Sequence, residues 1–77
     1  SLKGKRQVVK SLKDRIKHRF NVSIAEIEDQ DLWQKTVLAV ACVGNAHSHV
    51  QQIMDQVIGV VRGTPEVEVL RCDVEMM

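Results

Sequence analysis

The sequence predicts a single α+β domain, and two kinds of hydrophobic pattern carry that prediction. Apolar residues recur every three or four positions in two segments, which is the spacing of one face of an α-helix. Three other segments have alternating or nearly continuous apolar residues, which is the pattern of β-strands. The chain has 77 residues, of which 44% are hydrophobic and 27% charged. Such a length and composition are typical of one soluble globular domain, so we expect residues 1–77 to form a single unit.

The first helix is predicted at the start of the chain. Its apolar face consists of residues at helical spacing, namely Leu2, Val9, Leu12, Ile16 and Phe20. A strand is predicted over 21–28, where side chains of alternating character would point to opposite faces. A second strand is predicted over 36–43, whose nearly continuous apolar residues suit a strand that is covered on both faces or centrally placed. The acidic segment between these strands is predicted to be a turn.

A second helix is predicted over 46–62. Asn45 is a candidate N-cap, and Ser48 offers a competing cap one turn later. Gly63, with a proline two residues further on, is typical of a helix end. Alternating residues then predict a last strand over 67–76.

The resulting order, α-β-β-α-β, is one strand short of the ferredoxin-like arrangement β-α-β-β-α-β. The missing strand would be the central one, between 36–43 and 67–76. We therefore expect a ferredoxin-like antiparallel sheet whose first strand precedes Ser1 and is absent from residues 1–77. The alternative is that a strand of another chain fills the gap. Cys42 and Cys72 would then lie two strand spacings apart, about 9.6 Å in total. This distance is too long for a disulfide, so we expect two buried free thiols.

The net charge of +1 is distributed unevenly along the chain. Residues 1–19 contain eight Lys and Arg against Asp14, whereas residues 20–77 contain three Lys and Arg against nine acidic residues. A basic helix with few aromatic residues suits contact with RNA phosphates rather than stacking on bases. The alternative is a solvated helix face whose charge is balanced by the chain's own acidic residues. The candidate nucleic-acid contacts are Lys3, Lys5, Arg6, Lys10, Lys13 and Lys17, and Arg15 and Arg19 lie on the opposite flank.

Other candidate sites are weaker. Trp33 lies in the acidic turn and is a candidate partner-binding residue, although a single Trp can also close one end of a core. His47 and His49 are two residues apart and have no evident third ligand, so we expect no metal site. The sequence shows no phosphate loop and no nucleophile motif, so we expect no cofactor and no catalytic residues. Since no apolar run is long enough to span a membrane, we expect a cytoplasmic location.

Three segments carry a resemblance to a known family: Ser1-Leu2-Lys3-Gly4-Lys5-Arg6, Phe20-Asn21-Val22-Ser23-Ile24-Ala25-Glu26 and Asp31-Leu32-Trp33-Gln34. Together they resemble the YlxP-like family of bacterial proteins of undefined function. The family often has Glu at the position of Gly4. The resemblance implies a ferredoxin-like fold with a strand before the first of these segments. It implies no catalytic residues, because the family has none established.

The resemblance also bears on function, because the family is known for a gene position beside translation-initiation and ribosome-maturation factors. It implies a cytoplasmic bacterial protein associated with RNA or the small ribosomal subunit. We therefore expect a non-enzymatic binding protein that contacts RNA or the ribosome through its basic first helix. The alternative is a homo-oligomeric or protein-partner adaptor that uses exposed sheet edges and the turn around Trp33.

Overall fold

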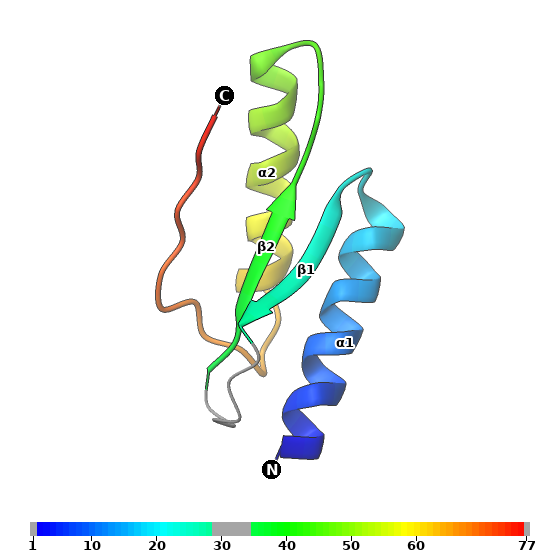
Figure 1. Ribbon diagram of the computed structural model, residues 1–77, viewed down its shortest axis with the longest axis vertical. Helices are drawn as coiled ribbons and strands as arrows, with labels where there is room; N and C mark the ends of the chain where they lie inside the picture. Colours follow the sequence, from blue (N-terminus) through cyan, green and yellow to red (C-terminus); the bar gives the residue numbers. More distant parts are fainter. Residues whose placement is uncertain (1, 29–34, 77) are drawn as a thin grey trace.

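The computed structural model describes residues 2–28 and 35–76. The elements follow one another as α1 (Leu2–Arg19), β1 (Ser23–Glu28), β2 (Val37–Ala41) and α2 (His47–Arg62). The two strands lie side by side, α1 runs along β1, and α2 lies behind the strands (Figure 1). The described chain is therefore an α+β arrangement of two helices and a two-stranded antiparallel sheet, so the α+β class is confirmed, whereas the ferredoxin-like sheet stays a prediction.

The two strands form a short antiparallel ladder. Ser23 pairs with Ala41 and Ala25 pairs with Ala39, and the register shifts near the end of β1. Ile24 is buried between exposed neighbours, as the alternating pattern predicts. Along β2, exposed and half-buried residues alternate, so this strand is covered on one face only.

The core lies between the helices and the inner face of the sheet. Four side chains are buried there, Leu12 and Ile16 of α1, Ile24 of β1 and Val57 of α2, and Ile16 has no exposed surface. Partly buried residues surround them: Phe20, Val22, Leu38, Val40, Ile53, Val60 and Val61. The helical spacing of apolar residues therefore identified the buried face of α1 correctly.

The two ends of α2 differ in how they are capped. Ala46 occupies the N-cap and has no side-chain acceptor, so the predicted caps at Asn45 and Ser48 are wrong. Asn45 precedes the N-cap position, and Ser48 lies inside the first turn. At the other end, Gly63 is the C-cap, as predicted, and its N–H donates to the Gly59 carbonyl at 2.9 Å. Buried Thr64 completes this end, because its hydroxyl donates to the carbonyl of residue 60 at 2.9 Å.

The prediction of a strand over 67–76 is wrong for the described chain. The segment is extended but has no ladder partner, and it runs past α2 to the C-terminus (Figure 1). Burial still alternates at its start, where Val67 and Val69 are half-buried, but a strand also needs a neighbour that accepts and donates backbone hydrogen bonds. Cys42 and Cys72 are both free, as predicted, but the prediction that both are buried is wrong: Cys42 is half-buried, and Cys72 is exposed because its segment does not join the sheet.

Candidate phosphate-binding surface of the first helix

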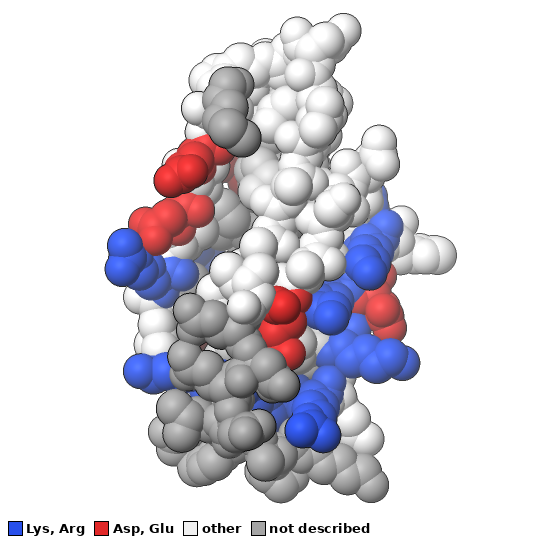
Figure 2. Space-filling model, viewed as in Figure 1, with Lys and Arg blue, Asp and Glu red and all other residues white. Residues whose placement is uncertain are grey.

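The basic side chains of α1 lie beside its buried face. Because successive residues of an α-helix are rotated by about 100°, Lys10 and Lys17 share one row, with Arg6 and Lys13 next to it. Arg6, Lys10 and Lys17 are exposed, and Lys13 is half-buried. Figure 2 shows Lys and Arg side chains gathered along the side of the molecule where α1 lies. We call Arg6, Lys10, Lys13 and Lys17 the basic row.

The described acidic residues form no ion pair with the basic row. The ion pair recorded among the described residues joins Arg71 to Asp73 at 2.8 Å, far from α1 in sequence. Asp14 and Glu26 are exposed and form no ion pair with the basic row. The described structure therefore leaves the charge of this row directed to solvent. The side chain of Lys3, and the whole of Trp33, lie outside the described residues.

Lys5 is placed differently from the rest of the predicted set. Its ammonium group donates a hydrogen bond to the backbone carbonyl of Lys35, and its side chain is half-buried. The helical rotation puts Lys5 close to the direction of Leu12 and Ile16, so it points toward the chain that leads into β2 rather than along the basic row. This contact joins residues thirty positions apart, and nothing in the local sequence indicates it.

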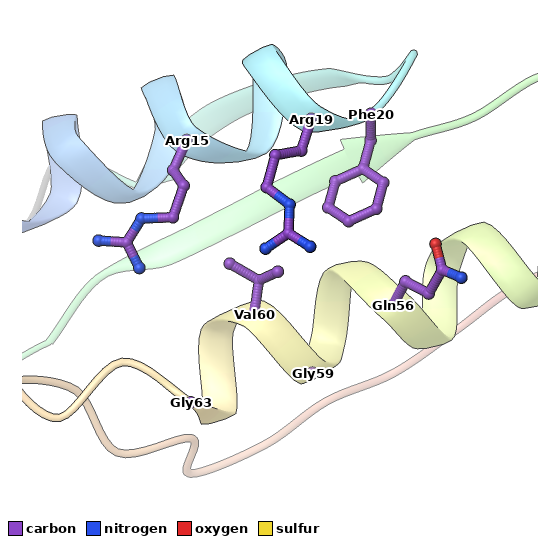
Figure 3. A pocket seen from close by; sticks show the side chains of 7 residues that line it. All are labelled: Arg15, Arg19, Phe20, Gln56, Gly59, Val60 and Gly63. Atoms are coloured by element: carbon purple, nitrogen blue, oxygen red, sulfur yellow. The ribbon is translucent and has the colours of Figure 1, made fainter.

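The opposite flank of α1 faces α2 across a shallow, open pocket of about 570 Å³. The pocket is lined by residues from the ends of both helices: Arg15, Arg19, Phe20, Gln56, Gly59, Val60 and Gly63. The Arg19 guanidinium lies over the Phe20 ring, 5.4 Å from its centre. Arg15 reaches the Thr64 hydroxyl at 3.5 Å, the long limit of a hydrogen bond. Figure 3 shows the Arg19 guanidinium between the two helices and the Arg15 guanidinium further along, beyond the end of α2.

Sequence reasoning placed Arg15 and Arg19 on this flank, but it did not identify the pocket. A helix period shows which residues share a face of one helix, whereas Gln56 and Gly59 join the arginines only through the packing of α2 on α1. No signal in a single sequence links these two segments.

The histidines lie at the first turn of α2. His47 and His49 are exposed, and the described residues contain no group of three His, Cys, Asp or Glu that could hold a metal ion. None of the described helices is long and apolar enough to cross a membrane.

The fold and the surface of α1 thus define a small α+β protein with a strongly basic helix. The chain belongs to the family described as "Protein of unknown function (DUF503)", whose sequence profile matches residues 1–74. It is 38% identical over 68 residues to "Uncharacterized protein YlxP" of Bacillus subtilis (strain 168), which covers 88% of this chain and 74% of that protein. The resemblance to the YlxP-like family is therefore confirmed. No solved structure matches the chain.

Proposed function

We propose that this chain is a non-catalytic, cytoplasmic RNA-binding protein that contacts phosphate groups of RNA or of the small ribosomal subunit through α1. The observation that carries the proposal is the basic row, whose cations have no acidic partner among the described residues. Unpaired cations along one helix attract a polyanion, and binding releases the counterions condensed on that polyanion.

The geometry of the row suits contact with several phosphates of one backbone. Arg6 and Lys17 are eleven residues apart, which corresponds to about 16 Å along the helix axis. Lys and Arg contacts to phosphate give affinity without reading bases, and the row contains no aromatic side chain for stacking. We therefore expect binding that depends on the shape and charge of a structured RNA more than on its sequence.

Salt-dependent binding tests the proposal. Fluorescence anisotropy would follow binding of the protein to a labelled RNA hairpin, and co-sedimentation would follow binding to purified small ribosomal subunits. We expect log K to fall linearly with log salt, with a slope of roughly −3 for a row of four cations. The double variant Lys10→Glu/Lys17→Glu should weaken binding and reduce the slope by about 2, one for each lost phosphate contact.

A matched control separates the basic row from overall charge. The double variant Arg62→Glu/Arg71→Glu changes the net charge by the same amount, but both residues lie outside α1. It should bind RNA more tightly than the Lys10/Lys17 variant. Equal loss in both variants, or no detectable binding of the unaltered protein at about 50 mM salt, would contradict the proposal, since electrostatic attraction is strongest there.

A second candidate function is association with another protein chain through the open edge of β2. Within the described residues, β2 pairs with β1 alone, and the apolar residues Val43 and Leu70, which lie outside the strands, are 95% and 69% exposed. An unpaired strand edge can accept a strand from another chain. Self-association measured by light scattering should persist at high salt if apolar contacts and backbone pairing drive it, whereas RNA binding should not.

A further inference from the structure

We propose that the pocket between α1 and α2 binds the phosphoryl group of a small organic ligand through Arg15 and Arg19. This site lies on the flank of α1 opposite the basic row, and it is independent of the RNA-binding proposal. Its side chains come from both helices, so the site exists only in the folded chain (Figure 3).

The charge of the lining favours an anion. Arg15 and Arg19 bring two positive charges to one pocket, and no carboxylate is among the lining residues. Two like charges that line one pocket repel each other, and an anion bound to either of them lowers that repulsion. A guanidinium group presents its N–H donors in a planar fork that matches the oxygens of phosphate.

The guanidinium groups retain donors for a ligand. Arg15 has one long contact, to Thr64, whereas its guanidinium carries five N–H donors. The Arg19 guanidinium carbon lies 5.4 Å from the centre of the Phe20 ring, and a cation–π contact of this kind uses none of the N–H donors of the group. No described residue accepts a hydrogen bond from Arg19. The contact with Phe20 therefore leaves the N–H donors of Arg19 available to a ligand.

The size of the pocket indicates a ligand larger than a free anion. Its volume of about 570 Å³ lies within the range of small-molecule sites, roughly 300 to 1,000 Å³. Phe20 and Val60 supply apolar surface beside the two arginines, and a Cβ atom placed on Gly59 would contact nothing within 4 Å. These features favour a phosphate monoester whose organic part rests against the apolar wall.

Titrations with three probes test this site. Chemical-shift changes of the backbone amides would be followed by NMR as adenosine monophosphate, inorganic phosphate or adenosine is added to the whole chain. We expect the monophosphate to bind more tightly than phosphate and adenosine not to bind. Arg15→Gln and Arg19→Gln should each weaken binding of the monophosphate about tenfold or more, the effect of losing a charge-assisted hydrogen bond.

Two further variants keep the test independent of overall charge and of folding. Lys10→Gln removes one positive charge from the opposite flank and should leave binding of the monophosphate unchanged. Gly59→Leu keeps both arginines but puts a large side chain in the open space beside Gly59, so binding of the monophosphate should be lost. Because Leu is a good helix former, the circular dichroism spectrum should be retained.

Three results would overturn the proposal. The first is the absence of binding of both phosphate and adenosine monophosphate at about 10 mM, the limit of a weak complex. The second is an equal loss of affinity in Lys10→Gln and the arginine variants. The third is loss of RNA-hairpin binding in the arginine variants when no monophosphate binds, because the phosphates recognised by the pocket would then be those of RNA. If the basic row does not bind RNA, the titrations with small probes still test the pocket, because they do not depend on RNA binding.

Discussion

Replacement of Gly59 by Ala should make the protein more stable. Gly59 lies inside α2, one turn before its end, and its φ angle is not positive. A Cβ atom at this position would have no heavy atom within 4 Å, so the added methyl group meets no clash. Glycine is unfavourable inside a helix because its unfolded chain has more conformational freedom to lose.

The expected gain follows from helix propensity. Ala is favoured over Gly by about 0.8 to 1.0 kcal/mol in a helix interior. The new methyl group faces the pocket and gains little burial, so propensity is the main contribution. For a domain of this size, about 1 kcal/mol corresponds to a rise in Tm of roughly 4–8 °C.

Thermal and urea unfolding followed by circular dichroism would measure the gain, and Gly63→Ala provides a matched control four residues along the chain. A Cβ atom on Gly63 would lie 3.1 Å from the Gly59 carbonyl oxygen, the same oxygen that accepts the Gly63 N–H. Gly63→Ala should therefore give no gain in stability. If Gly59→Ala lowers the Tm, or if both variants raise it equally, the reasoning from local space around the two glycines is refuted.

One further substitution tests the core, and one chemical modification tests the C-terminal segment. Ile16→Ala should destabilise the protein by about 2–5 kcal/mol, because Ile16 is wholly buried and its removal leaves a cavity. The free energy of urea unfolding would measure this loss. A cost under about 1 kcal/mol would mean that Ile16 is not packed as described. Cys72 should react with a thiol reagent before Cys42, since Cys72 is exposed and Cys42 is half-buried, and mass spectrometry of the partly modified chain would identify the order. If Cys42 were modified faster, Cys72 would have to be covered by other parts of the chain, and the described exposure of Cys72 would be wrong.

The parts of the fold that depend on neighbouring residues were predictable from the sequence. The buried face of α1 follows from the spacing of Leu12 and Ile16, and the end of α2 follows from Gly63, because both depend on helix geometry alone. The predicted strands contain β1 and β2, although each is longer than the strand that forms. Strand length is limited by how far two segments pair, which hydrophobic alternation does not express.

The errors occur where a distant part of the chain decides the outcome. Residues 67–76 have the alternation of a strand, but no described segment lies beside them to complete a ladder. The same applies to the candidate sites. The basic row could be identified from the sequence of α1, whereas the contact of Lys5 with Lys35 and the pocket around Arg15 depend on tertiary packing.

The uneven distribution of charge along the chain means that the net charge of +1 understates the positive field around α1. Positive charge is concentrated in α1 along one side of the molecule, while residues 20–77 carry an excess of acidic residues (Figure 2). A concentrated positive field of this kind would steer α1 toward a polyanion before contact. At physiological ionic strength this steering acts over about 8 Å, the screening length, and at low salt it reaches further.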